Sequence, residues 1–333
     1  MTDQPKYIIG VDAGGTKTQA VLTDQNENVF AWGKGGPANP TRISPERMCI
    51  SLKEAITEAM RGSVLPDGSK LPIDAICLGI AGGGKQEAQT LIMETVAGLG
   101  ITSKIIVVSD VVTAFWSAIP DGCGIIAIAG TGSSAYGVNA QGNAVIGGGW
   151  GYLVGDEGSG FDIGRSGMAA VLKAYEGRGP ATILQEHLLS YLNLATIEEV
   201  RYAIYRPLED DRKIAIAKFA PLVTEAAEEG DAVAQNILRH AGNEIGLNIV
   251  SVAQRLGLHD QAFESGLIGS VFKAGDLIIN PLRDVVLSVA PNAKIFVSDT
   301  PPSLGAARLA IQMLQKQSYP PTAESGAPPS IVL

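Results

Sequence analysis

The chain has 333 residues, of which 46% are hydrophobic and 18% are charged, and its formal net charge is -9. This length is typical of about two domains, and the hydrophobic content predicts a sizeable buried core. The negative charge argues against a general nucleic-acid-binding or anionic-membrane-binding protein, because both favour basic surfaces. An anionic ligand is not excluded, since backbone N–H groups and Mg²⁺ supply the attraction in many sites.

Cysteine and histidine are too scattered to predict a metal site. Cys49, Cys77 and Cys123 form no CxxC or Cys/His pair, so we expect small buried thiols in a reducing compartment. The sequence has no apolar leader segment and no run of about 18 apolar residues. We therefore expect a cytoplasmic protein without nucleic-acid or membrane partners.

Strand and helix patterns alternate in the first 120 residues. Apolar runs predict strands over residues 7–13, 18–24, 28–33, 73–79 and 104–109. Rough apolar stripes predict helices over residues 44–61 and 85–99, the first with Ser44 as its N-cap. Three strands followed by alternating helices and strands indicate an α/β domain with a mixed sheet.

A degenerate copy of the first strand–turn–strand unit begins at Gly124. Beyond it the pattern is mostly helical, and helices are predicted over residues 159–175, 181–192, 197–205, 212–229 and 232–256, the last after Asp231 as N-cap. Strands return over residues 263–268 and 294–297, and a final helix covers residues 304–316. We predict a disordered tail over residues 317–333, because this segment is rich in proline and low in complexity.

The first turn lies in Asp12-Ala-Gly-Gly-Thr-Lys-Thr18. Asp12 ends a buried strand, and Gly14 and Gly15 let a ligand approach the backbone closely. Thr16 adds a hydroxyl, and Lys17 faces either phosphate or solvent. A plain β-hairpin turn is the alternative interpretation. A Walker A loop does not fit, because a strand follows the turn instead of a helix.

The second turn is Gly130-Thr-Gly-Ser133. Its backbone N–H groups, together with the hydroxyls of Thr131 and Ser133, predict a phosphate cradle, and a plain turn is again the alternative. A strand follows this turn as well, which argues against a dinucleotide-binding fold. One unit used twice predicts two similar domains that grip one nucleotide phosphate.

Asp110 follows the apolar residues 105–108 and opens a predicted helix. One interpretation is a helix N-cap. The other is a general base, because ligands of α/β sheets bind at the carboxyl ends of the strands.

Residues 147–160 are too rich in glycine to predict a good helix or strand. They place Trp150, Asp156 and Glu157 on exposed backbone, a combination suited to carbohydrate, and a flexible glycine loop is the alternative. Further along, Gly266 and Gly269 in Ser265-Gly-Leu-Ile-Gly-Ser270 would let a flat ligand such as adenine lie against the backbone.

These five segments, in this order, resemble the N-acetylglucosamine kinase family of the sugar kinase/Hsp70/actin superfamily, near the BadF/BadG-type ATPases. The resemblance covers residues 7–316 and is most specific at Gly148-Gly-Trp-Gly151 and Gly155-Asp-Glu-Gly-Ser159. It implies an α/β fold of two actin-like (ribonuclease H-like) domains with a central ATP cleft. We expect an N-terminal domain over residues 1–118, completed by the helix 304–316, and a helix-enlarged C-terminal domain over residues 119–303. A homodimer is a further family-level expectation.

The implied activity is ATP-dependent phosphorylation of the 6-hydroxyl of an amino sugar, most directly N-acetylglucosamine. By matching motif, Asp12 would order Mg²⁺ through water and Asp110 would be the catalytic base. The ATP-binding residues would be Gly14, Gly15, Thr16, Lys17, Gly130, Thr131, Gly132, Ser133, Gly269 and Ser270. The sugar would be held by Asn39, Asp110, Gly149, Trp150, Gly151 and Asp156.

Three rival functions stay open at this point. The first is a kinase for glucosamine, N-acetylmuramate or another hexose derivative. The second is a BadF-type ATPase that activates a partner protein, and the third is a sugar sensor without catalysis. Two related groups fit less well, because one carries a zinc site on clustered cysteines and the other carries paired cysteines for an iron–sulfur cluster. Neither pattern occurs in this sequence.

Overall fold

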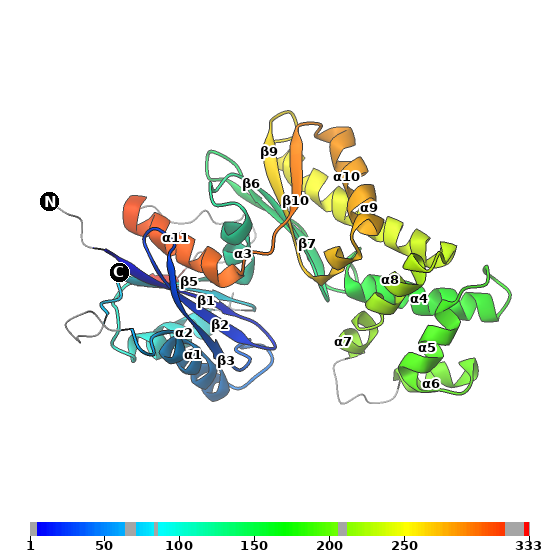
Figure 1. Cartoon of the computed structure of the whole chain (residues 1–333), viewed down its shortest axis with the longest axis horizontal. Coiled ribbons are helices and arrows are strands. Elements are labelled where there is room, and N and C mark those ends of the chain that lie inside the picture. The colour runs from blue at the N-terminus through cyan, green and yellow to red at the C-terminus, as the bar shows by residue number, and fades with distance from the viewer. Residues whose placement is uncertain (1–4, 64–70, 83–85, 206–211, 317–329, 333) are drawn as a thin grey trace. The chain divides into compact units, whose positions relative to one another are not determined.

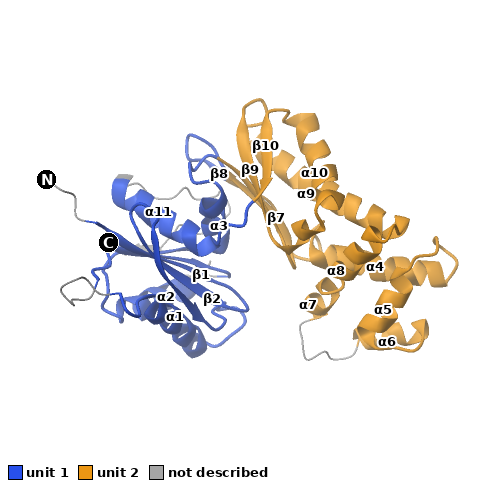
Figure 2. Ribbon diagram, in the orientation of Figure 1, with its two compact units in different colours: residues 1–123, 138–144, 298–333 blue, residues 124–137, 145–297 orange. Residues whose placement is uncertain are grey.

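The computed structural model describes residues 5–63, 71–82, 86–205, 212–316 and 330–332. The chain divides into two compact units, which Figure 2 colours separately. Unit 1 comprises residues 1–123, 138–144 and 298–333, and unit 2 comprises residues 124–137 and 145–297. The boundaries expected from the sequence, after residues 118 and 303, lie a few residues away from this division.

Unit 1 is built on a mixed sheet with the strand order β11-β5-β4-β1-β2-β3 (Figure 1). Its strands are β1 (Tyr7–Ala13), β2 (Thr18–Asp24), β3 (Val29–Gly35), β4 (Ala75–Ile80), β5 (Ile105–Ser109) and β11 (Ser330–Val332). The strands β1, β4 and β5 are parallel, and β2, β3 and β11 each run antiparallel to a neighbour. The carboxyl ends of β1, β4 and β5 therefore share one edge of the sheet.

Helices cover both faces of this sheet. They are α1 (Pro45–Ala59), α2 (Gln86–Ala97), α3 (Asp110–Ala118) and α11 (Pro302–Lys316). The helices α1 and α2 bury one face in an apolar core that includes Val11, Leu52 and Ile92. Figure 1 shows α3 and α11 on the other face. Ser44 caps α1 by accepting a hydrogen bond from the Arg47 N–H, which confirms the predicted N-cap.

Unit 2 contains a second mixed sheet with the order β10-β9-β6-β7-β8. Its strands are β6 (Gly124–Ala129), β7 (Ser133–Val138), β8 (Ala144–Gly148), β9 (Phe263–Ile268) and β10 (Ala293–Val297). Its helical elements are α4 (Gly160–Tyr175), α5 (Leu184–Leu192), η1 (Ile197–Glu199), α6 (Val200–Tyr205), α7 (Arg212–Ala217), α8 (Ala220–Glu228), α9 (Ala232–Arg255), η2 (Ser270–Ala274) and α10 (Asp276–Val289). Within the described residues, no helix is long and apolar enough to cross a membrane.

The two sheets repeat one topology. The order β5-β4-β1-β2-β3 in unit 1 corresponds strand for strand to β10-β9-β6-β7-β8 in unit 2. The first strand of each unit is parallel to the fourth, and the fourth is parallel to the fifth. This correspondence confirms the predicted α/β fold with two similar mixed sheets, and unit 2 is the one enlarged by helices.

Three expectations about elements were wrong. The single helix over residues 212–229 is broken into α7 and α8, because Pro221 has no N–H to donate to the Ala217 carbonyl oxygen and its ring would clash with that carbonyl in a continuous helix. Gly147 and Gly148 belong to strand β8 although they were expected to form a loop. Ser330–Val332 pair antiparallel with β5 instead of being disordered, whereas 317–329 and 333 lie outside the described residues.

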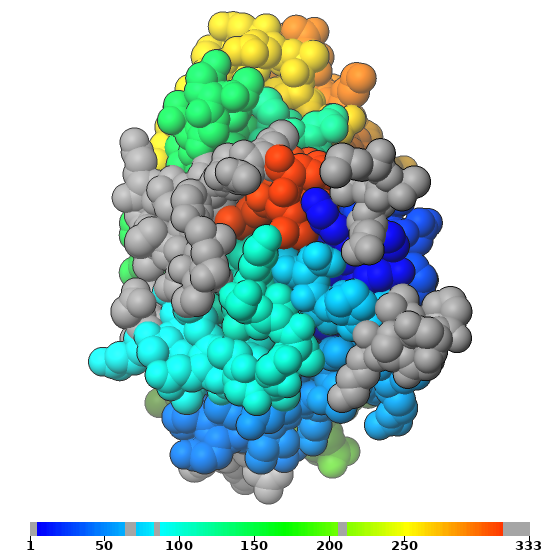
Figure 3. Space-filling model, turned by 90° about the vertical axis from the view of Figure 1, so that its left-hand side faces the viewer, coloured from blue at the N-terminus to red at the C-terminus, as the bar shows by residue number. Residues whose placement is uncertain are grey.

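Two glycines let α11 pack closely on the sheet of unit 1 and on α3. A Cβ atom on Gly10 of β1 would lie 2.0 Å from the Ser303 carbonyl oxygen and 2.5 Å from the Ala307 backbone nitrogen. Similarly, a Cβ on Gly305 would lie 1.9 Å from the Thr113 carbonyl oxygen of α3. In Figure 3 the surface of α11, in orange-red, lies beside the dark blue start of β1. These contacts fix α11 against the strand that carries Asp12 and the helix that carries Asp110.

We predict that Gly10→Ala lowers the free energy of unfolding by about 3 kcal/mol, because the added methyl group overlaps backbone atoms that have no room to move. The matched control is Gly177→Ala, where a Cβ meets nothing within 4 Å but the φ angle is +72°. The control should lose about 1 kcal/mol from backbone strain alone. Urea denaturation followed by circular dichroism measures both, and equal losses would contradict the packing argument.

Candidate functional site

Two acids meet at the carboxyl edge of the sheet of unit 1. Asp12 is the penultimate residue of β1, and Asp110 is the first residue of α3, directly after β5. The strand β4 runs between them, with Gly79 paired to Asp12 on one side and to Val108 on the other. A Cβ on Gly79 would lie 2.1 Å from the Thr113 hydroxyl, so glycine at this position lets α3 begin close to the sheet.

Asp110 is not the N-cap of α3. Ser109 holds that position, with its hydroxyl accepting a hydrogen bond from the Val111 N–H. The Ser109 hydroxyl also donates to the Asp110 carboxylate over 3.2 Å. The N-cap interpretation of Asp110 was therefore wrong, and its carboxylate is available for other partners.

The pKa values of both Asp12 and Asp110 are raised. Burial, followed by repulsion from Asp110, raises the pKa of Asp12 to about 6, against 3.8 for the free group, and Lys17 partly offsets this. Burial also raises the pKa of Asp110, although hydrogen bonds from Ser109 and from backbone N–H groups counteract it. Two desolvated carboxylates that repel each other favour a proton or a cation between them.

The first predicted turn is a tight β-hairpin that joins β1 to β2. The Gly14 N–H donates to the Lys17 carbonyl oxygen over 3.0 Å, and Thr16 and Lys17 are exposed. The hairpin interpretation is thus correct for the backbone, and it leaves the exposed groups of the turn available to a ligand.

The loop that carries Asn39 is tied to this hairpin. The Ala38 N–H donates to the Gly14 carbonyl oxygen over 3.0 Å. The Asn39 side-chain oxygen accepts from the N–H and the hydroxyl of Thr41, which closes a local turn. Unit 1 therefore gathers Asp12, the hairpin turn and the Asn39 loop in one region.

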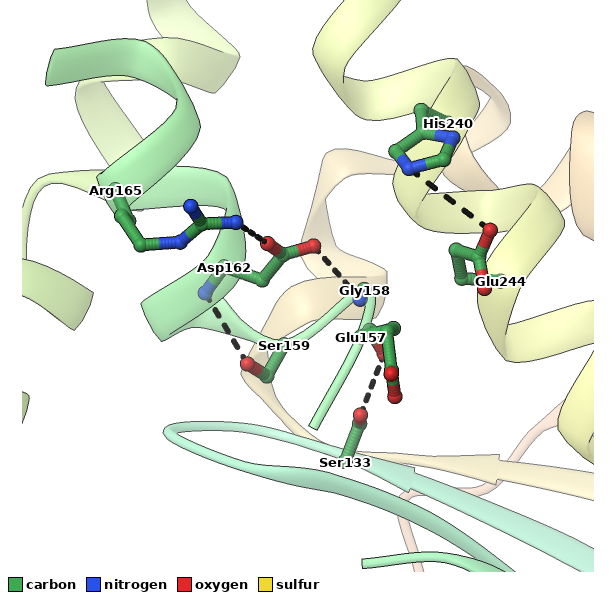
Figure 4. A network of polar contacts seen from close by, with 8 residues as sticks. All are labelled: Ser133, Glu157, Gly158, Ser159, Asp162, Arg165, His240 and Glu244. Atoms are coloured by element: carbon green, nitrogen blue, oxygen red, sulfur yellow. Dashed lines mark hydrogen bonds and ion pairs between the residues drawn. The ribbon is translucent and has the colours of Figure 1, made fainter. Parts of the chain in front are cut away.

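In unit 2 the turn 130–133 contacts the start of α4. The Gly160 N–H donates to the Gly130 carbonyl oxygen over 2.7 Å, and Ser159 caps the helix by accepting from the Asp162 N–H. Figure 4 shows the network that continues from here, in which Asp162 accepts from the Gly158 N–H and pairs with Arg165. The helix thus brings its electropositive N-terminus to the turn, an arrangement that favours anions.

Ser133 has a different role from the one predicted for its side chain. Its hydroxyl is buried and donates to the Glu157 carbonyl oxygen over 2.6 Å (Figure 4). A hydroxyl has one proton to donate, and phosphate oxygens require a donor. The predicted hydroxyl bond from Ser133 to phosphate therefore does not fit this geometry. Thr131, by contrast, is exposed on the same turn.

The glycine-rich loop after β8 presents a surface of apolar side chains. The exposed fractions are 78% for Trp150, 81% for Leu153 and 79% for Val154. Gly149 and Gly151, which flank the tryptophan, have φ angles of +74° and +88° and so need the freedom of glycine. Exposure of Trp150 was predicted, and an exposed indole face is what a sugar ring would stack on.

Asp156, in contrast, is buried, so the expectation of two exposed acids in this loop holds only for Glu157. The Asp156 carboxylate accepts hydrogen bonds from the Gly151 N–H over 3.2 Å and from the Lys213 ammonium over 3.0 Å. A Cβ on Gly132 would lie 2.7 Å from the same carboxylate. Asp156, which belongs to the glycine-rich loop, therefore also contacts the turn 130–133.

Gly269 directly follows β9 and lies against Ala129, the last residue of β6. Its φ angle is +125°, and a Cβ there would lie 2.1 Å from the Ala129 carbonyl oxygen. This close approach brings Gly269 beside the residue that precedes the turn 130–133.

Several residues of these regions were not predicted to matter. The sequence patterns place Gly79 only in a strand and Lys213 only in a helix, and no motif includes Arg42. The Arg42 side chain lies 3.6 Å from where a Cβ on Gly15 would be, which places a cation beside the hairpin turn. No local sequence pattern marks these residues, since their partners are distant along the chain.

The acid pair fits a magnesium ion. Among the described residues, no group of three or more His, Cys, Asp or Glu side chains forms a protein-only metal site. Mg²⁺ in phosphotransferases commonly uses one or two carboxylates, completed by water and phosphate oxygens. Such a cation would offset the repulsion between Asp12 and Asp110 that contributes to the raised pKa of Asp12.

The chain is similar to known proteins along most of its length. The chain is 34% identical over 307 residues to the N-acetylmuramic acid/N-acetylglucosamine kinase of Clostridium acetobutylicum, covering 92% of this chain and 98% of that protein. It is 31% identical over 313 residues to the N-acetyl-D-glucosamine kinase of Dictyostelium discoideum, with the same two coverages.

A solved structure supports the fold. It is the crystal structure of a candidate N-acetylglucosamine kinase from Chromobacterium violaceum, with a TM-score of 0.67 and 24% identity over 92% of this chain and 99% of that one. The sequence profile of the BadF/BadG/BcrA/BcrD ATPase family matches residues 9–310. The chain therefore belongs to the BadF/BadG/BcrA/BcrD ATPase family.

Proposed function

We propose that this chain is an ATP-dependent kinase that phosphorylates the 6-hydroxyl of an amino sugar, with N-acetylglucosamine as the first candidate substrate. The observation that carries the proposal is the pair Asp12 and Asp110 at one sheet edge, in a chain with sugar-kinase relatives along almost its whole length. Phosphoryl transfer needs positioning and charge neutralisation more than covalent chemistry. In this proposal, residues of both units would supply groups for these two tasks.

Asp110 is the proposed catalytic base. The 6-hydroxyl proton moves to its carboxylate while the hydroxyl oxygen bonds to the γ-phosphorus of ATP. The bond from that phosphorus to the β–γ bridging oxygen breaks, and ADP leaves. Burial raises the pKa of Asp110 from its usual value, which makes the carboxylate a better proton acceptor near neutral pH.

Asp12 is the proposed magnesium-ordering residue, acting through water. When bound, Mg²⁺ would neutralise the charge of the ATP phosphates. The Gly14 N–H already donates to the Lys17 carbonyl oxygen. The backbone N–H groups of Gly15 and the exposed Thr16 would therefore face phosphate on the side of unit 1, together with Lys17.

Unit 2 supplies the other proposed contacts. The Gly130 N–H donates within the turn to the Gly132 carbonyl oxygen. The N–H groups of Thr131 and Gly132, the Thr131 hydroxyl and the N-terminus of α4 would therefore bind phosphate oxygens. Gly269 and Ser270 would lie near the adenosine. The sugar would stack on Trp150 and bond to Gly149, Gly151 and Asp156, with Asn39 of unit 1 as a further ligand.

The substrate is tested by measuring ADP release with N-acetylglucosamine, glucosamine, N-acetylmuramic acid and glucose in parallel. We expect the highest kcat/KM with N-acetylglucosamine and one sugar phosphate formed per ADP. A preference for another sugar would change the proposed substrate but would still support a sugar kinase. Hydrolysis that is independent of sugar would instead favour the rival function of an ATPase that activates a partner protein.

We predict that Asp110→Asn lowers kcat by about 100-fold or more and leaves the KM for ATP within about 2-fold, since general bases contribute rate factors of this order. The matched control is Asp284→Asn, an exposed aspartate of α10. Steady-state kinetics on the preferred sugar measure both variants. Near-normal turnover of Asp110→Asn would refute the role assigned to this residue.

We predict that Asp12→Asn stabilises the folded chain at pH 7.5 by up to about 3 kcal/mol while it abolishes magnesium-dependent turnover. The folded chain holds the Asp12 proton more tightly than the unfolded chain, whose pKa is near 3.8, so the charged carboxylate destabilises the fold above pH 6. The gain from Asn should shrink as the pH falls from 6 towards 3.8.

Calorimetric melting at pH 7.5, 6.0 and 4.5 measures this gain, with Asp284→Asn as the control. A lower melting temperature for Asp12→Asn at pH 7.5 would show that the carboxylate is not a destabilising buried charge.

A further inference from the structure

We propose that Lys213 is a positioning residue for the sugar, acting through the carboxylate of Asp156. The proposal rests on the proposed function, in which Asp156 bonds to sugar hydroxyls. It adds a residue that lies in a helix outside every motif identified in the sequence.

The ion pair between Lys213 and Asp156 is largely shielded from water. The Lys213 ammonium lies 3.0 Å from Oδ2 of Asp156, and the side chains are 18% and 6% exposed. The same ammonium lies 5.2 Å from the centre of the Tyr152 ring, at cation–π distance. Lys213 thus contacts the glycine-rich loop at two of its side chains, one charged and one aromatic.

The backbone that carries Lys213 is itself fixed. A Cβ on Gly164 of α4 would lie 2.1 Å from the Ile216 carbonyl oxygen of α7, and one on Gly160 would lie 3.6 Å from the Ala217 carbonyl oxygen. The helix α7 therefore packs on the first turns of α4, whose N-terminus contacts the turn 130–133. Lys213 reaches Asp156 from a rigid support.

Asp156 is held from both sides of its carboxylate. Oδ1 accepts from the Gly151 N–H, Oδ2 accepts from Lys213, and the backbone has a φ of +59°, which is unusual for a residue other than glycine. A carboxylate has about four lone-pair sites, so these two bonds leave the remaining sites pointing in fixed directions. Lys213 also places a positive charge beside the buried carboxylate of Asp156.

A purely structural ion pair predicts a different result from a positioning pair. If Lys213 only supports the fold, its removal lowers stability and leaves both Michaelis constants unchanged. If it orients Asp156 for the sugar, its removal raises the KM for sugar selectively. A direct contact of Lys213 with ATP phosphates would instead raise the KM for ATP.

The test compares Lys213→Met, Lys213→Gln and Lys213→Arg, with Lys173→Met as a matched control on an exposed lysine of α4. The readouts are the KM for N-acetylglucosamine, the KM for ATP, kcat and the melting temperature. We expect the uncharged variants to raise the sugar KM by about 10-fold or more and to leave the ATP KM within about 2-fold, the size of effect of losing one charge-assisted bond. Lys213→Arg should restore most of the sugar affinity.

A double-mutant cycle identifies the partner. In an Asp156→Asn background, Lys213→Met should raise the sugar KM by less than about 2-fold, because the two changes act on one interaction. Full additivity, a selective rise in the ATP KM, or a loss of stability alone would each overturn the proposal. So would misfolding of both uncharged variants. Sugar phosphorylation by the wild-type chain is measured in the same assay, so a failure of the proposed function is seen separately.

Discussion

The approach of Asp12 to Asp110 is the interaction on which the rest of this account depends. Three parallel strands bring the two carboxylates to one edge, and Gly79 between them lets α3 begin close to the sheet. The pair costs stability, because burial and mutual repulsion raise the pKa of Asp12 to about 6. Destabilising charge pairs of this kind are found where the charges have a function. A magnesium ion beside ATP, or a proton from a sugar hydroxyl, would reduce the repulsion between the two carboxylates.

The duplicated sheet explains how one topology serves two tasks. Both units present a glycine turn after their first strand, but the surroundings of the turns differ. In unit 1 the turn follows an acid and is exposed, with Lys17 and Arg42 as nearby cations. In unit 2 the turn is neutral and is backed by the N-terminus of α4 and by the buried Asp156. The first environment suits metal and proton chemistry, and the second suits phosphate oxygens and hydroxyl groups.

Local patterns in the sequence predicted most of the strands, the capped helices and the repeat, because these depend on neighbouring residues. They failed where the deciding partner is distant. Pro221 interrupts the helix that the apolar spacing of residues 212–229 favoured. Gly147 and Gly148 belong to β8 because this strand pairs with β7. The hydroxyl of Ser133 is used by the Glu157 carbonyl, and the burial of Asp156 depends on Lys213, which is 57 residues away. Motifs thus identified the regions of the site, but not which atoms are already engaged.

The most direct test of the acid pair is carboxyl ¹³C NMR of aspartate-labelled protein, with Asp12→Asn and Asp110→Asn used for assignment. The account predicts that Asp12 titrates near pH 6 and Asp110 above its usual range. It also predicts that both titrations move to lower pH when Mg²⁺ and a non-hydrolysable ATP analogue are added. Two aspartates that titrate near 3.8 and do not respond to the metal and nucleotide would contradict it.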